Sequence, residues 1–224
     1  MKTEAVREMF KSYADESDTT FLTDAQITLY LEQGYSDFRR AVCDIDPFIY
    51  AKEFLFTMPS SGILDLTTTT PALLGENANG GTKLERLLRI ARINDTTNNE
   101  VISYMNAAPS ERTLNIDSYA FVNSKIITYA TSTSAYRLEY VPFHDVNFEP
   151  AIHPAQGHYI DDLDGFHDMI PLYAYTRYAI RDGADNVPLL QETQRKVSEL
   201  KSFLESGRSR EGSQYVIDHD SYWG

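Results

Sequence analysis

A dense group of histidines and aspartates lies between positions 153 and 168. Its members are His153, His158, Asp161, Asp162, Asp164, His167 and Asp168. Imidazole and carboxylate groups are common metal ligands, so the group could supply the site of a metal-dependent enzyme. The alternative is a set of acidic side chains gathered at a helix N-terminus, where they interact favourably with the helix dipole.

The spacing of this group does not match two common metal motifs. If Asp162 and Asp164 took the third and fifth positions of a calcium loop, Ile160 would be first and Pro171 last, and both end ligands would fail. His158 and His167 also lack the i, i+4 spacing of a zinc-binding helix. We therefore expect no metal here and keep the metal-dependent enzyme as the alternative function.

The segment GENANGGT is similar in spacing to a phosphate-binding loop. Gly75, Gly80 and Thr82 stand where that motif has its glycines and its hydroxyl. Gly81 occupies the position of the lysine that contacts the β- and γ-phosphates, and no clear parallel strand and helix flank the segment. We interpret it as a flexible hairpin loop.

Cys43 is the only cysteine, so no intrachain disulfide can form, which fits folding in a reducing cytoplasm. The neighbouring Asp44 and Asp46 disfavour a reactive thiolate, and the helical position suits a small buried residue. No G-x-S-x-G motif is present. These features favour a non-catalytic protein without cofactors.

The chain is acidic: 33 Asp and Glu against 20 Lys and Arg give a formal net charge of −13. Such a surface repels phosphate backbones and anionic lipid heads, so attraction to nucleic acid or membranes is not expected. The N-terminal residues lack the apolar core of a signal peptide, and no stretch approaches a membrane span. We expect a soluble protein.

The first helix with clear boundary signals begins after Thr23. Thr23 and Gln26 have the spacing of a capping box, and Pro47 disfavours helical geometry at Asp46. Between them, apolar residues recur at helical spacing: Ile27, Leu31, Tyr35, Phe38 and Val42. A shorter helix over residues 6–13 is predicted to precede it.

Residues 48–143 are rich in β-branched and aromatic residues, which predicts β-strands in this region. Residues 84–94 fit either a helix or a strand, and we favour a strand because their neighbours are strands. Two short strands around Asn123 and Ser124, followed by AYRLEYVPF, predict an antiparallel meander.

Arg86, Arg89 and Arg92 form a local basic run in this acidic chain. They could contact an acidic face on a neighbouring copy of the protein. The alternative is a solvated face, and in a strand the three arginines would not share one side.

Helical spacing returns after residue 160. Pro171 is expected to kink this helix or mark its start, and Pro188 begins a second helix that we predict to end at Gly207. The remaining segment has apolar and aromatic residues suited to docking on a partner: Tyr215, Val216, Ile217, Tyr222 and Trp223. The alternative is a frayed terminus.

Together these segments predict an α+β protein. Residues 1–47 and 160–206 would form an antiparallel helical bundle, 48–159 a β-rich antiparallel insertion, and 207–224 an extended C-terminal docking tail.

The order of these elements resembles that of the head-to-tail adaptor (connector) proteins of tailed bacteriophages. The segments that carry the resemblance are LTDAQITLYLEQGYSDFRRAV, the β-rich middle ending in YRLEYVPF, IPLYAYTRYAIRDGADN and VPLLQETQRKVSELKSFL. The likeness covers most of residues 20–206 and is one of layout, without a single diagnostic motif.

The resemblance implies a structural virion protein, assembled in the host cytoplasm, that forms a ring of twelve identical subunits in the virion neck. The ring would dock on the portal protein and offer a platform to a tail or nozzle protein, while DNA passes through without specific binding. Residues 213–223 would bind the portal, and loops within 59–83 and 94–117 would face the tail.

Overall fold

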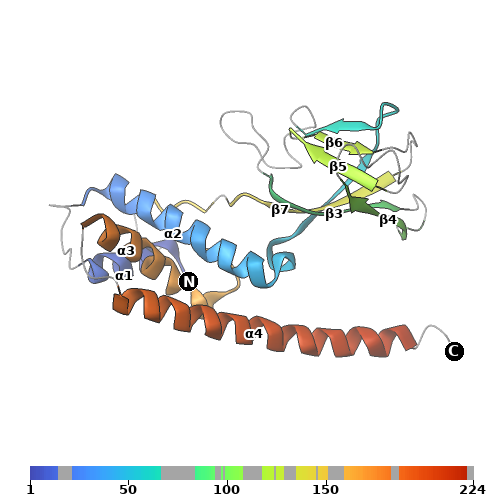
Figure 1. The fold of residues 1–224 in the computed structure, drawn as a ribbon. Helices are drawn as coiled ribbons and strands as arrows, with labels where there is room; N and C mark the ends of the chain where they lie inside the picture. Colours follow the sequence, from blue (N-terminus) through green and yellow to red (C-terminus); the bar gives the residue numbers. More distant parts are fainter. Residues whose placement is uncertain are drawn as a thin grey trace. The chain divides into compact units, whose positions relative to one another are not determined.

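The computed structural model describes residues 1–14, 22–66, 84–93, 97, 99–107, 118–123, 125–128, 135–144, 146–150, 159–182 and 187–220, with only the backbone at 84, 101, 182 and 207–220. The chain divides into two compact units. Met1–Asp46 and Asp145–Gly224 form a helical unit, and Pro47–His144 form a β unit (Figure 1).

The helical unit contains α1 (Thr3–Tyr13), α2 (Asp24–Ile45), α3 (Met169–Asp182) and α4 (Val187–Asp220). The predicted capping box is confirmed: the amide of Gln26 donates to the Thr23 hydroxyl, and the Gln26 side chain accepts from the Thr23 amide. Pro171 lies in the first turn of α3, where its missing N–H is not needed. No described helix is both long and apolar enough to cross a membrane.

The core of the helical unit lies where the helical spacing predicted it. Ile27, Leu31 and Phe38 of α2 are completely buried, together with Phe10 of α1 and Ile170 of α3. Burial of a large apolar side chain contributes about 1.5–3 kcal/mol, so this cluster supplies much of the stability of the unit.

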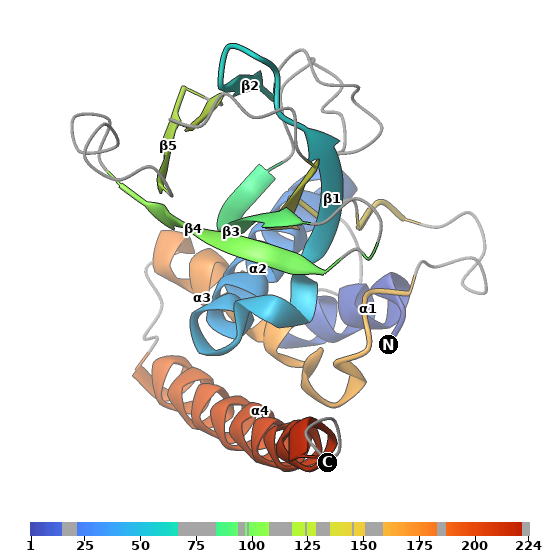
Figure 2. The same ribbon diagram turned by 90° about the vertical axis from the view of Figure 1, so that its right-hand side faces the viewer.

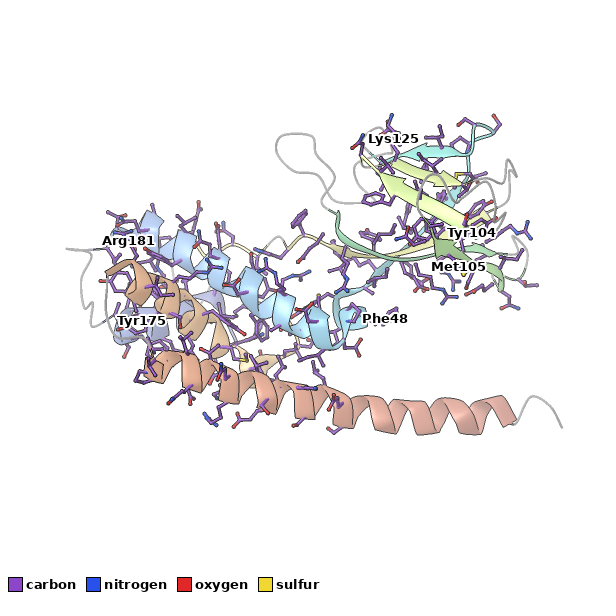
Figure 3. The ribbon with its side chains drawn as sticks, in the orientation of Figure 1. Phe48, Tyr104, Met105, Lys125, Tyr175 and Arg181 are labelled. Atoms are coloured by element: carbon purple, nitrogen blue, oxygen red, sulfur yellow. The ribbon has the colours of Figure 1, made fainter. Side chains whose placement is uncertain are left out.

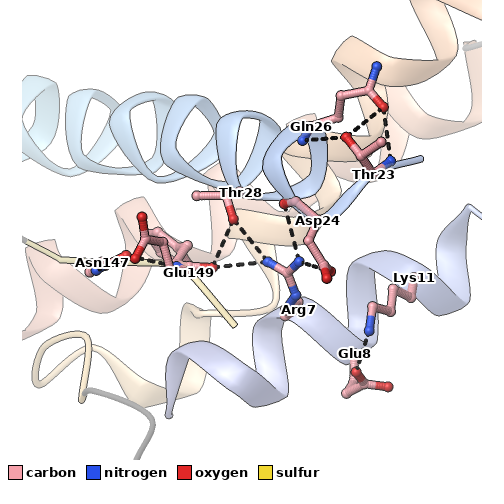
Figure 4. A network of polar contacts seen from close by, with 10 residues as sticks. Arg7, Glu8, Lys11, Thr23, Asp24, Gln26, Thr28, Asn147 and Glu149 are labelled. Atoms are coloured by element: carbon pink, nitrogen blue, oxygen red, sulfur yellow. Dashed lines mark hydrogen bonds and ion pairs between the residues drawn. The ribbon is translucent and has the colours of Figure 1, made fainter. Parts of the chain in front are cut away.

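A buried arginine joins α1 to α2 and to the segment that follows the β unit (Figure 4). Arg7 is only 1% exposed. Its Nη1 donates to the carbonyl of Phe148 at 3.0 Å and to the Thr28 hydroxyl at 3.1 Å, while Nη2 pairs with the Asp24 carboxylate. A buried guanidinium is tolerated only when its donors are satisfied, as they are here.

Helix α4 corrects the predicted C-terminus. It does not end at Gly207 but continues to Asp220, so the prediction of an extended tail is wrong for residues 207–220. Glycine inside a helix costs about 1 kcal/mol relative to alanine but keeps its backbone N–H, so it weakens a helix without ending it. Figures 1 and 2 show α4 as one continuous long helix.

The described residues of the β unit form a seven-stranded sheet. Its strands are β1 (Lys52–Thr57), β2 (Ile63–Asp65), β3 (Leu84–Ile93), β4 (Glu100–Asn106), β5 (Ser118–Val122), β6 (Lys125–Thr128) and β7 (Ala135–Pro142), after a short 3₁₀ turn η1 (Pro47–Tyr50). Their order is β1-β7-β3-β4-β5-β6-β2, and the sheet curls into a half-barrel (Figure 2). The strand prediction for residues 84–94 is confirmed over Leu84–Ile93, and residue 94 lies outside the described residues.

The predicted fold class is wrong in its description of this region. The pair β4–β5 is parallel, so the sheet is mixed, and it forms a compact unit of its own rather than an antiparallel insertion in a helical bundle. The predicted pair of strands around Asn123 is confirmed by the antiparallel β5 and β6. The third strand of the predicted meander is wrong, because β7 lies between β1 and β3 instead of beside β6. Short-range turn signals predict neighbouring hairpins, whereas the position of β7 follows from contacts distant in sequence.

The inner face of the sheet carries an aromatic core. Phe54 and Phe56 of β1 alternate with exposed residues, as do Tyr136, Leu138 and Tyr140 of β7 with less buried ones. The rings of Phe56 and Tyr136 stack at 5.6 Å between centroids. This alternation fixes the register, since a shift of one residue would turn every aromatic ring to the other face.

Candidate functional site

The described members of the histidine–aspartate group make contacts that stabilise the fold. His153 and His158 lie outside the described residues. His167 is completely buried, with Nε2 2.5 Å from Oδ1 of Asp161 and Nδ1 3.3 Å from Oδ1 of Asp164. Its ring packs edge-on against Phe38 of α2. The histidine therefore positions the start of α3 against α2.

The neighbouring carboxylates are engaged in the same way. Asp161 also accepts from the backbone N–H of Leu163 at 2.9 Å and from the Tyr35 hydroxyl at 3.3 Å. Burial first, and then the charge of Asp161, raises the pKa of Tyr35. Asp168 pairs with Lys196 of α4 at 2.7 Å. Among the described residues, no three His, Cys, Asp or Glu side chains are grouped so that they could hold a metal ion.

Cys43 and the glycine-rich segment were the other candidates for chemistry. Cys43 is buried in α2. The glycine-rich segment with Gly75, Gly80, Gly81 and Thr82 lies outside the described residues.

The three arginines of β3 do not form one basic stripe. Arg89 contacts Glu100 and Glu139 of the adjacent strands, and its Nη2 donates to the Ser103 hydroxyl at 2.9 Å. Arg86 is exposed, whereas Arg92 is half-buried. Arg86 and Arg89 pair with Val141 and Glu139, which lie on one face of β7, whereas Arg92 pairs with Tyr136 on the other face. Their contact with a neighbouring copy remains a prediction.

A surface groove between α2 and α3 is the strongest candidate for an interaction site. It has a volume of about 370 Å³ and is lined by Gln26, Leu29, Tyr30 and Gln33 of α2 and by Arg177, Ile180 and Arg181 of α3. Leu29 is 52% exposed and Ile180 58% exposed, so two large apolar side chains face solvent across the groove. Exposed apolar surface bordered by polar groups is typical of protein–protein contacts.

The two arginines of the groove differ in their electrostatic environment. The Arg177 guanidinium donates to both oxygens of Asp37, at 2.7 and 3.0 Å, and these hydrogen bonds raise its pKa. Arg181 lies near the C-terminal end of α3 (Figure 3), and its Nη1 donates to the Tyr30 hydroxyl at 3.0 Å. Among the described residues, no carboxylate pairs with Arg181. The groove therefore combines apolar side chains with one guanidinium suited to an acidic ligand.

Two apolar residues in the sequence indicate this groove, although the helical spacing of the core residues does not include them. Leu29 and Ile180 are large apolar residues that lie off the buried stripes of their helices. Isolated exposed residues of this kind are common. Only the packing of α2 against α3 shows that these two share one surface.

The residues predicted to dock on a partner lie at the end of the chain. Tyr215, Val216 and Ile217 belong to the C-terminal part of α4. Tyr222 and Trp223 lie outside the described residues. Comparison with known proteins adds no functional information: no protein-family model matches the chain, and no curated protein matches it.

Proposed function

We propose that this chain is a structural virion protein: a head-to-tail adaptor that forms a ring, in the expected case of twelve copies, between the portal and the tail or nozzle. The order of helices and strands along the chain, which resembles that of adaptor proteins, is one support for this role. The observation that carries it is the α2–α3 groove, whose Leu29 and Ile180 are exposed on a packed helical unit.

Ring formation requires two different surfaces on each subunit, because a cyclic interface joins one surface to another. The groove is one such surface. Burying Leu29 and Ile180 against a partner would remove apolar area from water, at about 25 cal/mol per Å². The net charge of −13 suits a ring through which DNA passes, because a negative surface repels the duplex and limits specific binding.

The proposal is tested by co-purification of the full chain with the portal protein of the same virus. We expect the wild type to bind in a fixed, ring-like stoichiometry and Leu29→Glu/Ile180→Glu to lose binding or ring assembly. Met105→Glu is the matched control, since Met105 is 60% exposed in the β unit. Wild-type protein that never joins a portal complex, at high concentration and in low salt, would exclude the adaptor function.

A further inference from the structure

We infer that the groove between α2 and α3 binds residues 215–220 of a second copy of this chain. This inference rests on the proposed function and names the contact by which successive subunits would be joined. It assigns the C-terminal segment to a neighbouring subunit, in place of the portal contact that the adaptor resemblance implies for residues 213–223.

The chemistry of the segment complements that of the groove. Residues 215–220 read YVIDHD, three apolar or aromatic residues followed by Asp218 and Asp220. Tyr215 and Asp218 are three residues apart, so on a helix the segment can present an apolar and an acidic group together. The groove is lined by the apolar Ile180 and by Arg181.

The charges of the segment and of the groove are complementary. A carboxylate of the segment can form a charge-assisted, bidentate bond with Arg181, whose Nη1 donates to the neutral Tyr30 hydroxyl. The apolar side chains of the segment would lie against Leu29 and Ile180, which are more than half exposed. An amphipathic helix bound in an apolar groove is a common mode of peptide recognition.

The length of α4 prevents a subunit from filling its own groove. Helix α4 spans Val187–Asp220, which at 1.5 Å per residue separates its ends by about 50 Å. Arg181 lies six residues before Val187, a distance of at most about 22 Å even in a fully extended chain. Asp220 of an intact α4 therefore stays about 28 Å or more from Arg181 of the same chain, so the segment must come from another copy.

A contact between the segment of one copy and the groove of the next is heterologous. Such contacts propagate from subunit to subunit and close into a ring when the rotation between subunits permits. The groove and the end of α4 would thus be the two different surfaces that a ring requires.

The test is the binding of a fluorescent peptide of residues 211–224 to the full-length chain, measured by anisotropy. The receptor carries Asp218→Arg/Asp220→Arg, so that its own segment does not compete. We expect saturable binding that Leu29→Asp abolishes and Arg181→Glu weakens at least about tenfold, because a charge-assisted bond is lost and a repulsion is added. Lys201→Glu, a substitution on the exposed face of α4, is the matched control and should leave binding unchanged.

A charge exchange makes the test specific. The peptide with Asp218→Arg/Asp220→Arg should bind the Arg181→Glu receptor better than the wild-type receptor. No binding to any receptor, or equal binding to the wild-type and Leu29→Asp grooves, would overturn the inference. A peptide that binds the portal but not the groove would also overturn it, while leaving the adaptor function intact.

Discussion

Gly34 of α2 lies directly against the backbone of Ile170 in α3. A Cβ atom at Gly34 would stand 2.5 Å from the Ile170 carbonyl oxygen and 3.0 Å from the amide nitrogen of Ala174. Backbone atoms in a packed helix cannot move aside at low cost. This close approach holds α2 and α3 together at the position where they form the groove.

Gly34→Ala should therefore destabilise the protein, although alanine is the better helix former. We expect a loss of about 1–3 kcal/mol in the free energy of unfolding, measured by urea denaturation. Gly165→Ala is the matched control, since a Cβ atom there would meet nothing within 4 Å. Equal stability of both variants would show that α2 and α3 do not pack this closely.

Removal of the buried guanidinium of Arg7 should also destabilise the protein. Arg7→Leu removes the donor that lies 3.0 Å from the Phe148 carbonyl, which keeps the Thr28 hydroxyl at 3.3 Å, and it removes the ion pair with Asp24. We expect a cost of about 1–3 kcal/mol in the free energy of unfolding. Glu8→Ala removes an exposed ion pair with Lys11 and should change stability by only about 0.5 kcal/mol. A small effect of Arg7→Leu would contradict the network described for this residue.

Alkaline pH should destabilise the helical unit through Tyr173. Burial, and then the nearby charge of Asp37, raises the pKa of Tyr173 from 10.0 to about 12. The unfolded state releases this proton first, so the stabilising contribution is complete below pH 10 and is lost as the pH rises toward 12.

Unfolding free energies measured from pH 9 to pH 12 should consequently fall less steeply for Tyr173→Phe than for the wild type. Tyr159 is 74% exposed, so Tyr159→Phe should follow the wild-type curve. Identical slopes for all three proteins would argue against the burial of the Tyr173 hydroxyl.

Deletion of residues 208–224 should separate folding from assembly. The described contacts that hold α4 to its unit lie before the deleted residues: Lys196 pairs with Asp168, Phe203 packs on Phe166, and Leu200 and Leu204 are buried. The truncated chain should melt within about 2 °C of the full chain, since a 1 kcal/mol loss would shift the midpoint by about that much or more. Association between copies should be lost. A large fall in melting temperature would instead give the segment a role in folding.

The sequence was most informative where structure depends on neighbouring residues. The capping box of Thr23 and Gln26 and the helix end before Pro47 are local features, and both were predictable. The place of β7 between β1 and β3 was not, because it depends on the shared inner face of a sheet whose strands are far apart in sequence. The groove was missed for the same reason, since Leu29 and Ile180 meet only after α2 packs on α3.

The role of the histidine–aspartate group was also not predictable from the sequence. His167 and Asp161 were candidates for metal binding because of their residue types, and the structure places them against each other in a buried pair. Their spacing in the sequence showed that His167 and Asp161 lie close together. It did not show that they pair with each other inside the fold.

The proposed adaptor function is tested most directly by negative-stain electron microscopy of the full chain mixed with the portal protein of the virus that the proposal implies. We expect a second ring stacked on the portal, present with the wild type and absent with Leu29→Glu/Ile180→Glu. Portal rings that never carry an added ring, across protein concentrations and salt conditions, would contradict it.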